Sequence, residues 1–352
     1  MLNLKPAQTR LLSRLSFLLI FISSLLFASG CGLLGTHKKV QVPQLLTPLT
    51  EADTPRLMSE VNRLASVRSV HGKADIVMED TSFAEAGIAE KYRQVEGTIT
   101  AQRPGRIYLV IQFSFVDLVQ MASDGEHFSV AILRGDEKYK RFVKGTNSAV
   151  YPKLDDDGSP NNQTKTKQRG EKEAVNALSN LRPQHLTDAL LPNPIGDATQ
   201  AGLTYVRSEF YQEEADNRPR AKSGIRVVRG YYLLEEISNT SGEARLSRRF
   251  WFDRVNGVRL ARLQTFDEKG LLITDVSYWD EKPFGEAAQV RLPARIEITR
   301  PHDHYKLSIA YQDPATVDID KEFRPEVFVL ANRWQLQEVD LDTRLRNKTV
   351  SP

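Results

Sequence analysis

The chain has 352 residues, a formal net charge of +3 and a single cysteine, and 40% of its residues are hydrophobic. The excess positive charge lies in the first 30 residues, so the rest of the chain is neutral and lacks the basic, aromatic-interleaved pattern of nucleic-acid binding. This composition excludes a nucleic-acid partner, and one cysteine excludes an internal disulfide.

The first 30 residues follow the order of a secretory signal peptide, with basic residues, an apolar run and then small residues. The apolar run, Leu15–Phe27, is shorter than the roughly 20 residues that span a bilayer. It leads to Cys31 in a pattern that resembles a bacterial lipobox, with Ala28 in place of the usual leucine. The resemblance implies cleavage between Gly30 and Cys31 and diacylglycerol on the Cys31 sulfur. An ordinary signal peptide with an incidental cysteine is the alternative.

Residues 31–54 contain prolines and polar residues, which predicts a lipidated N-terminus and a flexible tether. A helix is predicted to begin near Asp53 or Thr54, because Pro55 suits a first helical turn. Its apolar residues recur at helical spacing and form one stripe: Leu57, Val61, Leu64 and Val67. The same stripe fits a helix that packs on the core surface and a helix that covers a cavity.

After Ser69 the hydrophobic period changes to that of strands. Strands are predicted at 71–78, 92–101, 106–115, 118–123 and 127–133, with a hairpin turn at Asp124-Gly125. We expect the strand at 106–115 to be central. Large apolar residues share one face of two strands: Ile107, Leu109, Ile111, Phe113 and Phe115 in one, and Phe128, Val130 and Ile132 in the other.

Two polar stretches predict flexible inserts, near 151–170 and 212–222. The first begins with three consecutive aspartates, but it lacks the remaining ligands of an EF-hand calcium loop, which favours a solvated loop. Two short helices are predicted between the inserts, around 174–181 and 186–191. Prolines at 192 and 194 end the second helix.

Strands resume at 203–210, 224–237, 245–253, 258–266, 271–279, 291–300 and 305–311, with turns at Asn256-Gly257 and Lys269-Gly270. About a dozen strands and few helices predict a mainly β (α+β) fold. Its single large antiparallel sheet would curl into a half-open barrel of about eleven or more strands, with helices on the concave side. The final residues, 331–352, are expected to be a loose C-terminal tail.

A succession of short motifs across residues 55–330 resembles the LolA/LolB group of lipoprotein carriers. The motifs are Arg103-Pro104-Gly105-Arg106-Ile107-Tyr108-Leu109, Ser123-Asp124-Gly125, Trp251-Phe252-Asp253, Asn256-Gly257-Val258, Leu292-Pro293-Ala294-Arg295-Ile296, Phe323 and Pro325. The resemblance implies a half-open barrel that encloses an apolar cavity for acyl chains. The expected lining residues are Ile107, Leu109, Ile111, Phe113, Phe128, Val130, Ile132, Leu292, Ile296, Ile298, Leu307 and Ile309.

The resemblance also implies a membrane-contacting loop after the third strand of the barrel. Phe115, Val116 and Leu118 occupy that neighbourhood, and core packing is the alternative explanation for their apolar side chains. Gly32 and Leu33 after the cysteine resemble an outer-membrane sorting pattern.

Enzymatic and metal-binding motifs are missing from the sequence: there is no Gly-x-Ser-x-Gly elbow, no zinc helix and no phosphate-binding glycine loop. His302 and His304 would share one face of a strand, but they follow Pro301 at a predicted hairpin tip without a third ligand nearby. No enzyme, metal site or cofactor is predicted, apart from the acyl groups on Cys31.

The sequence therefore predicts a monomeric outer-membrane lipoprotein that faces the periplasm and is attached to the membrane through its lipid. It would bind acyl chains of lipoproteins or lipids, help to localise or insert them, and work with a periplasmic carrier protein. A sensor of lipids or lipoproteins and a structural envelope lipoprotein with a self-filled interior are the alternatives.

Overall fold

The structure is a computed structural model that describes residues 42–81, 89–135, 137, 140–149, 151, 182–196, 202–216, 218, 221–239, 242–288 and 290–350. The chain divides into two units, residues 1–44 and 45–352, and the second is described below. The signal peptide, Cys31, most of the tether, residues 152–170 of the first insert and the helix predicted around 174–181 lie outside the described residues.

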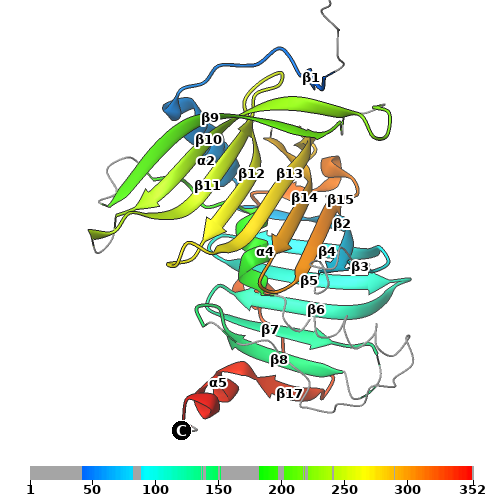
Figure 1. Ribbon diagram of the computed structural model, residues 1–352. Helices are drawn as coiled ribbons and strands as arrows, with labels where there is room; N and C mark the ends of the chain where they lie inside the picture. The colour runs from blue at the N-terminus through cyan, green and yellow to red at the C-terminus, as the bar shows by residue number, and fades with distance from the viewer. Residues whose placement is uncertain are drawn as a thin grey trace, which may run out of the picture. The chain divides into compact units, whose positions relative to one another are not determined.

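The described strands belong to one hydrogen-bonded sheet (Figure 1). The first part of the chain forms β1 Gln44–Leu45, β2 Ser69–Asp80, β3 Glu90–Lys91, β4 Val95–Gln102, β5 Arg106–Phe113, β6 Val116–Asp124, β7 His127–Ile132 and β8 Arg141–Thr146. The later part forms β9 Leu203–Ala215, β10 Arg226–Ser238, β11 Arg245–Asp253, β12 Arg259–Phe266, β13 Leu272–Phe284, β14 Val290–Arg300, β15 Tyr305–Tyr311, β16 Asp318–Ile319 and β17 Gln337–Asp340.

Strand β2 joins the two halves of this sheet. Its residues Ala74–Asp80 pair with β15, the last of the consecutive strands β9 to β15, and its residues Ser69–Ile76 pair with β4, the first of β4 to β8. In Figure 1 the strands of one half run across those of the other. The end strands β9 and β17 pair only with β10 and β8 among the described strands, so the sheet curls without closing. The predicted mainly β, half-open antiparallel fold is confirmed, with β17 and β8 as a parallel pair.

Three helices accompany the sheet in the described part of the chain: α2 Thr54–Ala65, α4 Pro183–Leu190 and α5 Leu341–Val350. Helix α2 begins where it was predicted, because the Asp53 side chain accepts a hydrogen bond from the Arg56 backbone N–H at 3.0 Å and Pro55 occupies the first turn. In Figure 1, α2 lies behind strands β10 and β11, so the viewer sees the opposite face of the sheet.

One hydrophobic core joins the concave faces of both halves of the sheet to α2 and α4. The largest fully buried side chains come from strands of both halves and from α2, including Ile99, Leu109, Phe250, Tyr305 and Leu57. The alternation of apolar and polar residues along each strand places one face in this core and the other in solvent.

Two expectations about polar segments are wrong. The described part of the predicted tail, residues 331–350, is not loose, because β17 pairs with β8 and both Val339 and Leu341 are buried. The segment 212–222 is not wholly an insert, because its first four residues continue β9 to Ala215, paired with Arg226. Ion pairs across this exposed hairpin, such as Arg229 with Glu214 at 2.7 Å, allow charged residues to form a strand.

Candidate functional site

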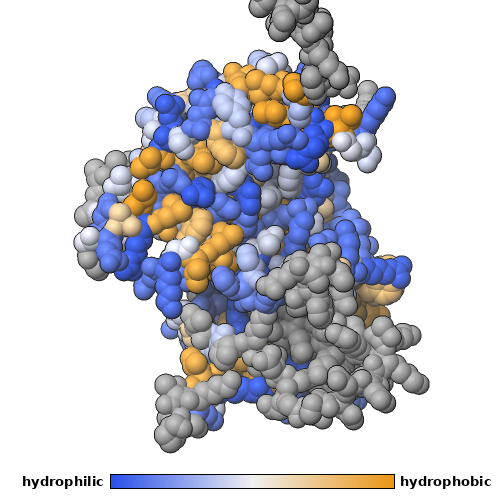
Figure 2. Space-filling model, viewed as in Figure 1, coloured by the Kyte–Doolittle hydropathy of each residue, from blue (hydrophilic) through white to orange (hydrophobic). Residues whose placement is uncertain are grey.

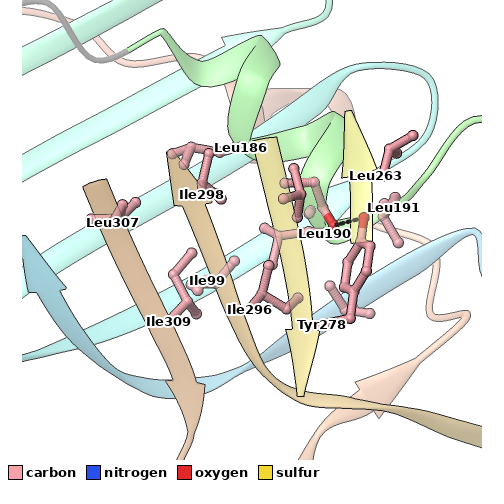
Figure 3. Close-up of a cluster of buried hydrophobic side chains, with 14 of the residues drawn as sticks. Ile99, Leu186, Leu190, Leu191, Leu263, Tyr278, Ile296, Ile298, Leu307 and Ile309 are labelled. Atoms are coloured by element: carbon pink, nitrogen blue, oxygen red, sulfur yellow. Dashed lines mark hydrogen bonds between the residues drawn. The ribbon is translucent and has the colours of Figure 1, made fainter. Parts of the chain in front are cut away.

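The concave face of the sheet is covered by residues 183–195, which comprise α4 and the segment that follows it; we refer to them as the cover. Helix α4 packs against β4, β5, β6 and β14, and thus touches both halves of the sheet. Figure 3 shows Leu186, Leu190 and Leu191 of the cover lying near Ile298 and Tyr278 of the sheet. The contact is apolar and continuous with the core, which makes it the candidate site for an apolar ligand.

The residues predicted to line a cavity lie together on this concave face, with one exception. All but Phe113 have exposed fractions of 8% or less: Ile107, Leu109, Ile111, Phe128, Val130, Ile132, Leu292, Ile296, Ile298, Leu307 and Ile309. Phe113 is 38% exposed, so its predicted role is wrong. Phe113 is the last residue of β5 and lies next to the exposed hairpin tip formed by Ser114 and Phe115.

The interior beneath the cover holds little free space. A pocket of about 20 Å³ lies among Leu64, Val67, Leu190, Tyr278 and Ile296, with Leu292 also at its wall. That volume is close to what one water molecule needs. An acyl chain therefore fits beneath the cover only if the cover moves away from the sheet.

Hydrogen bonds from two side chains, Arg103 and Asn62, fasten the cover at its C-terminal end. Arg103, in the turn between β4 and β5, donates to the Val67 carbonyl at 3.0 Å, to the Asn193 side chain at 3.2 Å and to the Pro192 carbonyl. Asn62 of α2 exchanges two hydrogen bonds with the Ile195 backbone, at 2.9 and 3.2 Å. Burial lowers the pKa of Arg103, while Asp188 of the cover acts in the opposite direction.

Two further contacts complete the attachment of the cover. The Tyr278 hydroxyl donates to the Ala189 carbonyl at 3.2 Å, the dashed line in Figure 3. Burial raises the pKa of Tyr278 well above its usual value, so the hydroxyl remains a donor. Arg248 of β11 donates to the Asn193 carbonyl at 3.3 Å. Arg103 belongs to a motif noted in the sequence, but the fastening of the cover by these polar residues was not predicted. Their partners lie far away in the chain.

His185 makes the stability of the cover depend on pH. Burial, and then the charge of Arg300, lower the pKa of His185 from 6.5 to about 3, with Asp303 opposing and Arg182 adding to the effect. Because the imidazole binds its proton only after unfolding, stability is complete above pH 6.5 and falls as the pH drops from 6.5 towards 3.

We expect the free energy of unfolding to fall by about 1–2 kcal/mol more between pH 7 and pH 5 in the unmodified protein than in His185→Gln, since glutamine does not titrate. Urea denaturation at the two pH values measures this difference. Equal losses of unfolding free energy in both proteins would contradict the assignment of this pH dependence to His185.

The predicted membrane-contact residues lie at the hairpin between β5 and β6. Phe115 is 97% exposed at its tip, and Val116 is also exposed, whereas Leu118 packs against the core. Ser114 and Phe115 have φ angles of 48° and 66°, a left-handed conformation that large side chains rarely adopt. This two-residue turn presents the Phe115 ring to solvent.

The residues described form neither a membrane-spanning helix nor a metal site. None of the described helices has the length and apolar character needed to cross a membrane. His302 and His304 lie in the turn between β14 and β15, and no three His, Cys, Asp or Glu side chains in the described ranges gather as metal ligands would.

Comparison with known proteins finds no protein-family profile and no curated protein that matches this chain. Solved structures do resemble it. A LolA superfamily protein from Nitrosomonas europaea has 9% identity and a TM-score of 0.39, covering 80% of this chain and 99% of that one. A DUF1329 family protein from Desulfovibrio piger has 12% identity and a TM-score of 0.36, covering 80% and 97%.

A domain from Vibrio parahaemolyticus, described as an outer membrane lipoprotein-sorting protein, has 11% identity and a TM-score of 0.37, covering 78% of this chain and 94% of that one. The structural neighbours thus include the group that the sequence motifs resemble.

Proposed function

We propose that this protein binds acyl chains between the concave face of its sheet and the cover, and that it helps to localise or insert lipoproteins or lipids at the outer membrane. The observation that carries the proposal is the cover itself, an apolar helix laid over a continuous apolar face. Its polar attachments are single hydrogen bonds from side chains of α2, of the β4–β5 turn and of β13. Acyl binding in this place requires no catalytic group.

The energetics suit a carrier that must also release its cargo. Burying about ten methylenes would contribute about 8 kcal/mol, at about 0.8 kcal/mol each. Part of that gain is offset, because Leu186 and Leu190 leave their own buried positions when the cover moves. The net affinity is then moderate, which allows an acyl chain to leave again.

A photoreactive fatty acid with a diazirine at its chain end tests the position of the site. We expect mass spectrometry to find the label on peptides that contain concave-face residues such as Ile99 and Ile298. Labelling confined to the solvent-facing side of the sheet would contradict the proposal.

The membrane anchor and the location are part of the same proposal. The lipobox-like ending at Cys31 and the residues after it support an acylated N-terminus held at the outer membrane with the folded unit in the periplasm. A periplasmic carrier protein is the proposed donor of cargo. The intact mass of protein extracted from bacterial membranes tests the anchor: the expected mass is that of residues 31–352 plus acyl groups, and the unmodified mass would contradict it.

A second candidate function is a structural envelope lipoprotein that takes no ligand. The filled interior, with about 20 Å³ of free space, favours this candidate. The two functions differ in one observable property, because only a carrier binds acyl chains in stoichiometric amounts.

Phe115 is the proposed membrane contact for delivery. We expect Phe115→Glu to reduce binding of the unlipidated chain to phospholipid vesicles about tenfold, because an aromatic side chain that would enter the membrane is replaced by a charge. Leu271→Glu is the matched control, since Leu271 is exposed in another hairpin turn. Equal effects of the two substitutions in vesicle co-sedimentation would contradict the assignment of Phe115 as the membrane contact.

A further inference from the structure

Strands β12 and β13 separate from each other and leave a cleft on the outer face of the sheet. Their pairing ends at Arg262 and Ser277. Beyond that point β13 continues to Phe284 paired with β14, while the start of β12 pairs with β11. The cleft has a volume of about 620 Å³. Figure 2 shows hydrophilic and hydrophobic side chains interleaved on the face of the sheet turned to the viewer.

Helix α2 closes the inner end of this cleft through charged residues. Glu60 accepts a hydrogen bond from the Leu260 backbone N–H at 3.3 Å and pairs with Arg63 at 2.8 Å. Arg63 also pairs with Glu281 of β13 at 3.1 Å. Glu281 is only 15% exposed and has a second arginine, Arg259, at 3.6 Å. The helix is thus tied to β12 by a hydrogen bond and to β13 by an ion pair, and the ion pair can exchange for a pair with a charged ligand.

Two buried hydrogen-bond donors belong to residues that line the cleft. The Trp279 indole nitrogen and the Arg295 Nε are buried atoms that make no hydrogen bond within the described part of the chain. They lie on paired residues of β13 and β14, and the guanidinium stacks on the indole ring at 5.4 Å. The nearest carboxylate to Arg295, that of Asp280, is 3.8 Å away. Buried donors without acceptors cost free energy, and the Arg295 side chain is 40% exposed, so an acidic group bound in the cleft can reach its guanidinium.

The cleft and the interior are separated by a thin wall. Leu64 of α2, Tyr278 of β13 and Pro293 of β14 line both the outer cleft and the small apolar pocket beneath the cover. A shift of α2 would move Leu64 out of this wall and connect the polar cleft with the apolar interior.

We propose that an anionic amphiphile, with a phosphate or carboxylate head, binds with its head on Arg295 and Trp279 and its acyl chain passing between the separated strands into the interior. The proposal rests on the acyl-binding function proposed above and adds the entrance and the charge of the head group.

Binding of dodecyl phosphate to the whole mature chain, carrying Cys31→Ala so that no detergent is needed, tests this inference. Quenching of tryptophan fluorescence gives the affinity, because Trp251 and Trp279 line the cleft. We expect Arg295→Met to weaken dodecyl phosphate binding about tenfold and to leave dodecanol binding unchanged, since methionine keeps the apolar stem and loses the charged donors. Arg295→Lys should restore part of the affinity. Arg249→Met is the matched control, because Arg249 stacks on Phe266 away from the cleft.

Two results would overturn the inference. One is equal binding of dodecyl phosphate by the Arg295→Met and Arg249→Met variants. The other is binding of inorganic phosphate as tight as that of dodecyl phosphate, which would mean that no acyl chain enters. A chain that binds neither dodecyl phosphate nor dodecanol would instead refute the proposed acyl-binding function.

Discussion

Arg103→Ala is expected to destabilise the cover and to speed the exchange of acyl ligands. The substitution removes three hydrogen bonds made by one charged side chain to the cover and to the end of α2. Because hydrogen bonds to charged groups contribute about 1.5–3 kcal/mol each when buried and less near solvent, we expect a total loss of about 3 kcal/mol. Urea denaturation measures this loss, and stopped-flow release of a fluorescent fatty acid should be at least about tenfold faster.

Arg68→Ala is the control for Arg103→Ala, because Arg68 is a nearby exposed arginine. It should change neither stability nor release rate appreciably. If Arg103→Ala lost stability but released ligand at the unmodified rate, the hydrogen bonds of Arg103 would be structural and the cover would not control ligand exchange.

Leu186→Ala is expected to lower the free energy of unfolding by about 2–5 kcal/mol, since Leu186 is fully buried and its loss leaves a cavity. The cavity would lie between α4 and the concave face, where the acyl chain is proposed to bind. A ligand that binds the folded state stabilises it by mass action, so saturating laurate should recover part of the lost stability.

The control for this recovery is Leu46→Ala. Leu46 is also buried but belongs to a separate apolar cluster with Val227 and Val255, away from the main core. We expect a comparable loss of stability and no more recovery by laurate than the unmodified protein shows. Equal recovery in the two variants would place the ligand somewhere other than beneath α4.

The fold was predictable because the sequence carries local signals for it. Strict alternation gave the bounds of the strand at 305–311. Asn256-Gly257 turns the chain between β11 and β12, with both residues at positive φ. Asp53 and Pro55 marked the start of α2. The buried face of each strand followed from the same alternation, which explains why most predicted lining residues are in the core.

The errors arose where distant contacts override the local pattern. Phe113 continues the alternation of β5, yet it is exposed because it ends the strand beside the exposed hairpin tip. Strand β17 reads as polar, yet it is held by pairing with β8 and by Lys144, whose ammonium lies 3.0 Å from Glu338. The fastening of the cover by Arg103 and the separation of β12 from β13 depend on residues far apart in sequence, which no local pattern reports.

Native mass spectrometry of residues 45–352, after incubation with a diacyl phospholipid, tests the central claim most directly. The proposed function predicts a one-to-one protein–lipid complex, together with faster lipid exchange in Arg103→Ala. The absence of any complex, in both the unmodified unit and Leu186→Ala, would contradict acyl binding. The second candidate function, a structural envelope lipoprotein that takes no ligand, would then be favoured.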